Sequence, residues 1–520
     1  MSGSIASALC FLALALALPA AVTAQEPSPR SLSLEEALQV AEGASENVGI
    51  ARAAVERARG ERKRARSEYF PQLTGSATYT RTIESQFDIA RDAEALIPGR
   101  CRVPFTAQPA LPGRLDSLEA AVECVSRFGA AGGGGLANLP FGRPNAYNFG
   151  LTLSQRLFDG GRTSGQSRAA AAAFEGAQIG LTAAQAQLVL DVTQAYYDAL
   201  LADRLVFIAE ATLEQADTTL AQTQLARDVG TTSEFELLRA RVTRDNQRPV
   251  LIRRRAERDV AYVRLKQLLN IPVAQPVALT TGLEDTTTVP AAAIEALVEA
   301  PGDTTPDLRA PVRQAAAAVE SQRGLLGAAK GERWPSLNVT SSFAQLAYPS
   351  DAFPGTDDFL TDWTVGVGLS VPLFSGGRVG GAVAVAKANL RDAELRLQQT
   401  REAAQVDARS TLLELEAARA AVLASEGTVE QATRAYRIAE LRYREGLSTQ
   451  TELLDSRLQL QQAQANRARD ARDLEVARIR TALLPALPLA QPALAPPGST
   501  APPAGSGAGS QTVQAGVTTQ

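Results

Sequence analysis

One long stretch of this chain occurs twice, and the repeat restricts the fold more than any other feature. The first copy, Leu157 to Leu238, opens with LFDGGR and closes with RDVGTTSEFELL. The second copy, Leu373 to Leu454, opens with LFSGGR and closes with REGLSTQTELL. The two copies align from end to end at a constant offset, without a gap. A repeat at constant spacing indicates one structural unit built twice.

Each copy predicts a very long helix followed by a turn and a second helix. The two helical hairpins are expected over residues 162–269 and 378–484. Gly230 and Gly446 fit the left-handed position at which helices commonly end. The long helices carry apolar and small residues in heptad spacing, which is typical of coiled coils. At 1.5 Å per residue such a helix is roughly 100 Å long, more than a globular domain can hold.

In four short segments apolar and polar residues alternate with a period of two. This pattern predicts strands at residues 71–82, 146–157, 335–346 and 362–373. Each segment has one apolar face and one face of Thr, Ser, Asn or Gly, and its length suits a tilted strand that crosses a bilayer. Aromatic residues near the strand ends suggest two interfacial belts. A soluble sandwich is the alternative. Four strands cannot close a barrel with a lumen, so we expect the chain to oligomerise, with three copies supplying twelve strands.

The remaining segments complete the expected organisation. Residues 1–24 have the apolar core and cleavage site of a signal peptide. No later apolar run is long enough for a transmembrane helix, so strands are the expected means of membrane insertion. The predicted divisions are a first repeat (25–270) with an extracellular loop (83–145), an equatorial linker (271–305), a second repeat (306–484), and an uncharged, disordered tail (485–520).

Composition argues against catalysis and against several kinds of site. The chain contains no histidine and has a net charge of −4. We therefore expect no enzyme activity, metal site, cofactor or nucleic-acid partner. Cys101 and Cys124 lie in the predicted extracellular loop. An oxidising compartment would favour a disulfide between them, with two free thiols as the alternative.

The duplicated motifs resemble those of the TolC-like outer-membrane efflux protein family. They are the strand entries YFP and RWP, the LFDGGR and LFSGGR motifs, and the two glycine turns before ELL. The resemblance implies a mainly α fold with transmembrane β-strands, in which a homotrimer forms a 12-stranded β-barrel on a 12-helix α-barrel. It further implies an outer-membrane exit duct with a long periplasmic extension. Its expected partners are outer-membrane lipid, a periplasmic adaptor and an inner-membrane efflux or secretion transporter.

The resemblance also implies roles for residues at the hairpin turns. Gly230 and Gly446 match the tip glycines near which adaptors dock. Glu452 and Asp455 match acidic positions that ring the periplasmic entrance. Three copies of each carboxylate would focus a negative potential on a narrow mouth and favour cations.

A second pair of residues matches positions that hold the family's closed state. These are Tyr443, before the second tip, and Glu236, after the first. Helix capping alone would also account for Glu236 and Glu452. Ser448 stands where some members have Arg, so the resemblance does not extend to the salt-bridge part of that lock.

A structural coiled-coil protein that spans the envelope without a lumen is the alternative function. It explains the heptads equally well, but it leaves the strands unexplained. The sequence does not indicate the exported substrate.

Overall fold

The computed structural model describes residues 30–84, 118–119, 122–123, 144–283, 294–349 and 351–489. The chain divides into two compact units, each assembled from separate segments. The first unit comprises Met1–Val48, Thr182–Val312 and Thr400–Gln520, and the second comprises Gly49–Leu181 and Arg313–Gln399. The predicted signal peptide, both loop cysteines and most of the predicted tail lie outside the described residues.

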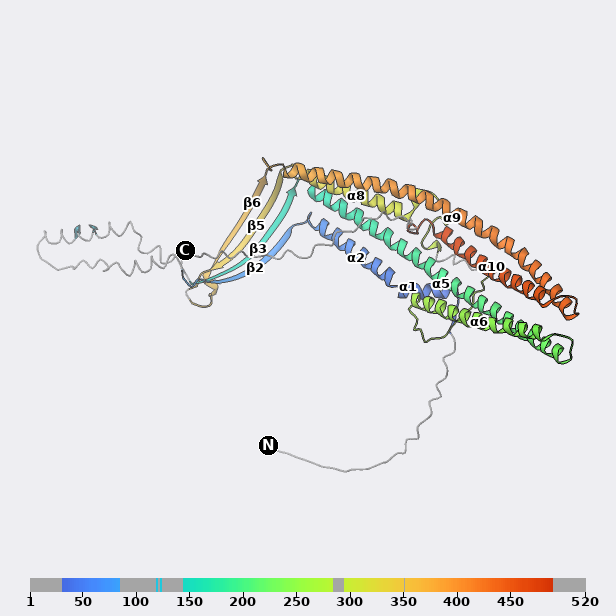
Figure 1. The fold of residues 1–520 in the computed structure, drawn as a ribbon. Helices are drawn as coiled ribbons and strands as arrows, with labels where there is room; N and C mark the ends of the chain where they lie inside the picture. Colours follow the sequence, from blue (N-terminus) through green and yellow to red (C-terminus); the bar gives the residue numbers. More distant parts are fainter. Residues whose placement is uncertain are drawn as a thin grey trace, which may run out of the picture. The chain divides into compact units, whose positions relative to one another are not determined.

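The second unit contains a four-stranded antiparallel sheet with the order β2-β3-β5-β6 (Figure 1). Its strands are β2 (Gln72–Arg81), β3 (Asn145–Phe158), β5 (Ser336–Ala347) and β6 (Phe359–Ser370). The central pairing joins β3 of the first repeat to β5 of the second. Strands from the two repeats therefore form one continuous sheet.

Three strands lie within two residues of the predicted positions, and the fourth is shifted. The sequence predicts 362–373, whereas β6 starts at Phe359 and ends at Ser370. Pro372 follows soon afterwards, and proline has no N–H to donate to a strand ladder. The alternating pattern of side chains therefore continues past the point where the hydrogen-bonded strand ends.

One face of this sheet is apolar and uncovered. On β6 the alternate residues Trp363, Val365, Val367 and Leu369 are each about two-thirds exposed in the described protomer. A soluble sandwich would bury these side chains against a second sheet. Among the described residues, the outer strands β2 and β6 each pair on one side only.

Glycines allow the sheet and the long helices to meet at close range. The turn between β3 and α5 (Arg162–Asp228) contains Gly160 and Gly161, both at positive φ. A Cβ on Gly160 would lie 2.5 Å from the Gly331 carbonyl oxygen, so only glycine fits there. Gly376 and Gly377 repeat this positive-φ pair before α9 (Arg378–Arg444).

The helices of the second unit also pack through small residues. They are α2 (Glu46–Ser67), α8 (Ala310–Gly331) and the first turns of α5 and α9. A Cβ on Gly165 of α5 would lie 2.5 Å from the Gly324 carbonyl oxygen of α8. The backbones of α5 and α8 are therefore in direct contact at this point.

The first unit contains the helical hairpins, formed by α5 with α6 (Glu234–Leu268) and by α9 with α10 (Gln450–Leu483). A shorter helix, α1 (Leu34–Ala44), starts at a complete capping box between Ser33 and Glu36. Most residues of the α5 heptad rows are buried, including Val192, Ala199, Val206 and Ala209. The heptad pattern therefore marks the packed side of α5.

Two features of the first unit were not predicted. β1 (Arg30–Leu32) pairs in parallel with β4 (Val277–Leu279), inside the segment interpreted as a linker. The disordered tail was also predicted to begin at residue 485, and this is wrong for the first residues. Ala486 and Leu487 are buried, and the Pro485 carbonyl accepts a 2.7 Å hydrogen bond from the Ala310 N–H. Apolar residues inside the Pro- and Ala-rich segment are sufficient to pack locally.

Candidate functional site

The two hairpin turns have the same backbone geometry. At the first turn, the N–H of Gly230 donates to the Arg227 carbonyl and the N–H of Thr231 donates to the Ala226 carbonyl. At the second, Gly446 and Leu447 make the equivalent hydrogen bonds. This is the Schellman arrangement, which requires a positive φ, here 78° at Gly230 and 72° at Gly446. Both turns are therefore fixed by backbone hydrogen bonds.

A hydroxyl side chain then starts the second helix of each hairpin. Ser233 accepts a hydrogen bond from the Glu236 N–H, and Thr449 accepts one from the Glu452 N–H. Each such cap stabilises a helix by about 1 kcal/mol. These caps use the backbone of Glu236 and Glu452. In the described hairpins the returning carboxylate bond that completes the capping box of α1 is not present.

The two acidic residues after the second turn are exposed. Glu452 and Asp455 lie one helical turn apart at the start of α10. Asp455 accepts a 3.0 Å hydrogen bond from Gln459 on its own helix. Both carboxylates are therefore available to groups outside the protomer.

The structure does not join Tyr443 to Glu236. The Tyr443 hydroxyl lies 3.3 Å from the Thr223 hydroxyl of α5, and its ring packs against the cluster of Tyr436, Leu453 and Leu460. The Oε2 atom of Glu236 is buried and has no hydrogen-bond partner in the described structure. Tyr443 therefore ties α9 to α5 through a threonine.

Arg457 makes a further tie that sequence reasoning missed. It lies on α10, is 6% exposed, and its Nη2 donates to the Thr219 hydroxyl at 2.9 Å and to the Gln215 carbonyl at 3.4 Å. Its Nε has no partner in the described structure. An arginine in a helix is usually taken for a surface residue. The sequence offered one signal that this part of α5 has polar neighbours. Thr223, the partner of Tyr443, continues a heptad core row of α5 with a polar side chain.

The contact between α5 and the second hairpin is therefore polar near the turns. Gln450 is 2% exposed, and neither end of its amide has a hydrogen-bond partner among the described residues. The Ser448 hydroxyl is also buried without a described partner. Unsatisfied buried polar groups cost free energy that water would restore. Separating these helices would cost less here than across an apolar core.

The far end of the second hairpin is held by a buried ion pair. Arg309 is fully buried, and its Nη2 lies 2.7 Å from the Asp407 carboxylate of α9. Its Nη1 donates to the Ala404 carbonyl, and Arg480 of α10 approaches the other Asp407 oxygen at 3.5 Å. Removing one partner of such a pair costs about 3–5 kcal/mol. This end of the hairpin is therefore sensitive to the loss of either charge.

Burial changes the pKa of a carboxyl group between α5 and α6. Desolvation raises the pKa of Asp203, although a 2.6 Å hydrogen bond from the Tyr262 hydroxyl and the charge of Arg258 oppose the rise. Desolvation, followed by the hydrogen bond to Asp203, raises the pKa of Tyr262. The hydrogen bond between Tyr262 and Asp203 links the two helices in addition to the ion pairs Arg255–Glu210 and Arg244–Asp217.

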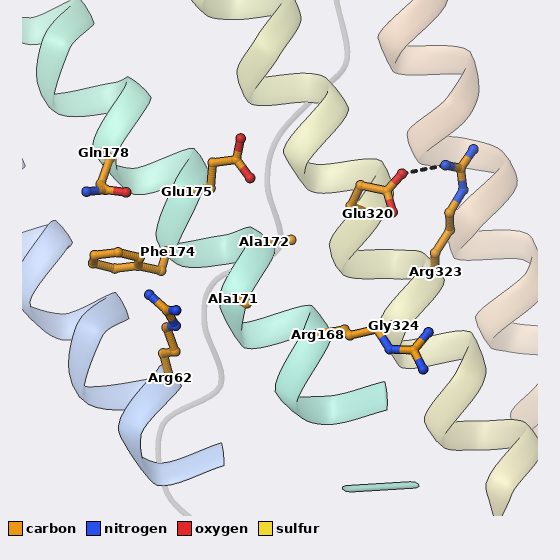
Figure 2. Close-up of a pocket in the computed structure, with 10 residues that line it drawn as sticks. All are labelled: Arg62, Arg168, Ala171, Ala172, Phe174, Glu175, Gln178, Glu320, Arg323 and Gly324. Carbon is orange, nitrogen blue, oxygen red and sulfur yellow. Dashed lines mark hydrogen bonds and ion pairs between the residues drawn. The ribbon is translucent and has the colours of Figure 1, made fainter. Parts of the chain in front are cut away.

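A groove of about 620 Å³ lies in the second unit, lined by α2, α5 and α8 (Figure 2). The Arg62 guanidinium lies 5.3 Å from the centre of the Phe174 ring, and Arg323 forms an ion pair with Glu320 (Figure 2). Both signs of charge line the groove, so it does not indicate a ligand of one charge.

Metal-binding clusters and membrane-spanning helices are both absent from the described part of the chain. Those residues contain no cluster of three or more acidic or cysteine residues that would hold a metal ion. No described helix is both long and apolar enough to span a membrane.

Known proteins share this architecture. The model of the outer membrane efflux protein family matches residues 128–270 and 306–484. The outer membrane efflux protein BepC of Brucella suis biovar 1 (strain 1330) is 24% identical over 298 residues, which span 54% of this chain and 59% of that protein. The chain thus matches little more than half the length of this relative.

Solved structures extend the likeness to most of the fold. The outer membrane protein VceC from Vibrio cholerae superposes with a TM-score of 0.64 at 17% identity, covering 86% of this chain and 95% of that one. The open state of the MtrE outer membrane channel from Neisseria gonorrhoeae gives a TM-score of 0.64 at 19% identity, covering 87% and 88%. The predicted fold class is confirmed, and the chain belongs to the outer membrane efflux protein family, which is located in the cell outer membrane and is not a family of enzymes.

Proposed function

We propose that this chain is the outer-membrane exit duct of a tripartite efflux or type I secretion system. In this proposal it is a passive homotrimeric channel, and a periplasmic adaptor and an inner-membrane transporter open it at the helical turns. The observation that carries the proposal is the four-stranded sheet with an exposed apolar face and two unpaired edges.

The sheet is incomplete as a membrane structure in one protomer. Unpaired backbone groups cost several kcal/mol each in hydrocarbon, so an open edge must find a partner strand. β2 of one copy and β6 of the next supply those partners. Three copies of four strands then close a ring of twelve around a lumen, with the apolar face of each sheet toward lipid.

The exposed acids after the second turn are the proposed cation-selective ring. Glu452 and Asp455 are exposed at the end of the hairpin, and a threefold axis would bring three of each together. Fixed negative charge at a narrow mouth raises the local concentration of cations. We assign adaptor docking to the surfaces around Gly230 and Gly446, where the backbone geometry is rigid and repeated.

The closed state of the proposed gate is held by contacts between α5 and the second hairpin. Tyr443 with Thr223 and Arg457 with Thr219 make these contacts in the described protomer. Glu236 keeps its place in the gate because its buried Oε2 needs a hydrogen-bond donor that the described protomer does not supply. The pairing of Cys101 with Cys124 remains a prediction about the extracellular loop.

Single-channel recording in planar lipid bilayers tests the duct and its mouth together. The purified native protein should conduct, and Glu452→Ala with Asp455→Ala should reduce its preference for cations. Asp470→Ala with Asp473→Ala is the matched control, because it removes two carboxylates from the same helix away from the turn.

Each outcome of the recording separates the hypotheses. Unchanged selectivity in the Glu452 and Asp455 variant would refute the ring. The complete absence of conductance, in the native protein and in every variant of the turns, would favour a structural coiled-coil protein without a lumen.

A further inference from the structure

Two grooves lie on opposite sides of the helices α2, α5 and α8 in the second unit. The larger is the groove of Figure 2, which Arg62 of α2 and Arg168 of α5 line. The smaller, of about 420 Å³, is lined by residues that include Arg64 and Gln166. In both helices, residues two positions apart therefore line different grooves. At roughly 100° per residue such positions are about 160° apart around the helix axis, so the grooves open on opposite faces of the same three helices.

The sheet indicates which groove lies on the lipid side. On β3, Arg156 belongs to the polar face, because it lies an odd number of positions from the apolar Leu151 and Leu153. Its guanidinium forms an ion pair with Glu68 at 3.4 Å, and Glu68 lines the smaller groove. The smaller groove therefore continues the polar face of the sheet. The larger groove continues the apolar face, which the proposed function turns toward lipid.

The helices meet the sheet along one of its edges. Gln155, near the end of β3, donates a 3.1 Å hydrogen bond to the Tyr69 carbonyl just after α2. A Cβ on Gly160 would lie 2.5 Å from the Gly331 carbonyl oxygen, so the start of α5 meets the end of α8. Trp334 follows α8 at this edge and is 62% exposed. Aromatic residues mark the interface between hydrocarbon and water, so phospholipid headgroups would lie beside these helix ends.

The signs of charge are separated along the larger groove. At 1.5 Å per residue, Arg62 lies about 8 Å from the end of α2, and Arg168 lies about 9 Å from the start of α5. Arg323 lies about 12 Å from the end of α8. The two acidic lining residues are deeper, with Glu320 about 17 Å from the end of α8 and Glu175 about 20 Å from the start of α5. The groove carries both signs over its whole length, but its end nearest the sheet is positive.

Two exposed cations extend this positive end toward the sheet. Arg66 lies four residues after Arg62, on the same face of α2. Lys330 lies seven residues after Arg323, on the same face of α8. Each is one residue from the end of its helix, and neither has an ion pair among the described contacts. They lie within the headgroup layer, which is roughly 5–8 Å thick on each side of a bilayer. These two cations form the rim of the groove.

The arginines inside the groove are available to a ligand. The Arg62 guanidinium stacks near the Phe174 ring, and its Nε atom is buried without a hydrogen-bond partner in the described structure (Figure 2). Arg168 has no ion pair among the described residues. A buried donor without an acceptor costs free energy, which a bound anion would restore. Phosphate suits this position, because its oxygens accept two parallel hydrogen bonds from one guanidinium.

We propose that the membrane end of the larger groove binds the phosphate of an anionic phospholipid of the periplasmic leaflet. Arg62 and Arg168 hold the phosphate in the groove, and Arg66 and Lys330 approach it from the rim. The inference rests on the proposed function, because it requires the sheet to lie in the membrane. A lipid is the source of the phosphate, since the groove continues the apolar face along which acyl chains lie. Four cations favour a headgroup with a net negative charge over a zwitterionic one.

Quenching of tryptophan emission by brominated lipids tests the site in the complete chain. The chain contains two tryptophans, Trp334 next to the end of α8 and Trp363 on β6, about 23 Å from the strand end at Ser370. Trp363→Phe leaves Trp334 as the reporter, and Trp334→Phe leaves Trp363. In phosphatidylcholine vesicles, the purified protein should prefer brominated phosphatidylglycerol over brominated phosphatidylcholine at Trp334. It should show no such preference at Trp363.

Two double variants compare the two faces at one level. Arg66→Gln with Lys330→Gln removes the rim and should lower the preference at the reporter about 25-fold, roughly fivefold for each cation. Arg64→Gln with Arg162→Gln is the matched control, because it removes two exposed cations close to the same helix ends. Arg64 lines the smaller groove, and Arg162 lies four residues before Gln166 of that groove. The control should leave the preference unchanged.

Two further measurements separate a phosphate site from a general attraction between charges. Arg62→Lys keeps the charge but loses the forked pair of donors, so it should also lower the preference for phosphatidylglycerol. Inorganic phosphate, compared with chloride at equal ionic strength, should not displace the lipid.

The outcomes distinguish this inference from the proposed function. If the native protein conducts but Trp334 reports no preference for phosphatidylglycerol, the lipid site is overturned and the duct stands. An equal fall in both double variants, or an unchanged preference in Arg62→Lys, would also overturn it, because any cationic surface would then suffice. Displacement by inorganic phosphate would overturn lipid as the source of the phosphate. If no brominated lipid quenches either tryptophan, the sheet does not lie in the membrane and the proposed function itself is overturned.

Discussion

The contact between Thr219 and Arg457 allows a sharp test of whether the polar layer near the turns favours opening. Thr219→Val preserves shape and removes the 2.9 Å hydrogen bond to the buried guanidinium. Arg457→Met removes the charge and retains much of the side-chain volume. Thr219 keeps its hydrogen bond to the Gln215 carbonyl in the methionine variant, so that change leaves the threonine satisfied.

The expected changes in the free energy of unfolding have opposite signs. Loss of a hydrogen bond to a charged group costs about 1.5–3 kcal/mol, and Thr219→Val should be destabilising by that amount. Replacing incompletely paired buried charge by an apolar group is neutral or stabilising by about 1–4 kcal/mol. Arg457→Met should therefore be at least as stable as the native protein. The free energy of unfolding of the double variant should be close to that of Arg457→Met. Without the guanidinium, Thr219→Val has no hydrogen bond to Arg457 to remove.

Denaturant unfolding of the purified trimer, followed by circular dichroism, measures the stabilities, and single-channel recording measures opening. Thr219→Val should raise the fraction of time the channel is open, and Arg457→Met should lower it. If Arg457→Met were the more destabilising of the two, the hydrogen bonds of the guanidinium would outweigh its burial cost. That result would refute the idea that this polar layer favours separation of the helices.

Three further predictions concern other contacts. Asp407→Ala should lower the free energy of unfolding by about 3–5 kcal/mol, because it leaves Arg309 buried without a counter-charge. Arg309→Met with Asp407→Leu should recover most of that loss. Denaturant unfolding would check both variants, and an equal loss in the double variant would contradict the reasoning. Gly165→Ala should impair assembly of folded protein, because its Cβ would lie 2.5 Å from backbone atoms of α8. Gly327→Ala should be tolerated, because the nearest atom to its Cβ would be 3.9 Å away. The yield of trimer in the outer membrane compares the two variants. Because burial raises the pKa of Asp203 in the folded state, its contribution to stability is present at low pH and is lost as the pH rises through the raised pKa. Asp203→Asn should therefore be relatively more stabilising at neutral than at acidic pH, and a difference in melting temperature that does not change with pH would exclude this linkage.

Most of the fold was predictable from the repeat and from the two spacings at which its apolar residues recur. The change from period two to heptad spacing located the strands and hairpins to within a few residues. The reason is that apolar residues recur at the spacing that places side chains on one face of a strand or of a helix. Gly230 and Gly446 fixed both turns, since a left-handed residue at a helix end strongly favours glycine. Predictions failed where local composition and local packing disagree. Pro372 ends the hydrogen-bonded strand while the alternation continues, and the apolar Leu487 packs although its surroundings resemble a disordered tail.

Only the tertiary structure identified the hydrogen-bond and ion-pair partners of residues that lie far apart in the sequence. Nothing near Arg457 in the sequence identifies Thr219 as its acceptor, and nothing near Arg309 indicates that Asp407 neutralises it, because each pair joins segments that only folding brings together. The sequence by itself determined the periodic elements, their turns and the family, since these depend on residues close together in the chain. The tertiary structure decided which polar groups are buried and which of them remain unsatisfied among the described residues. Burial and pairing are properties of neighbours in space, and the amino-acid sequence alone does not specify those neighbours.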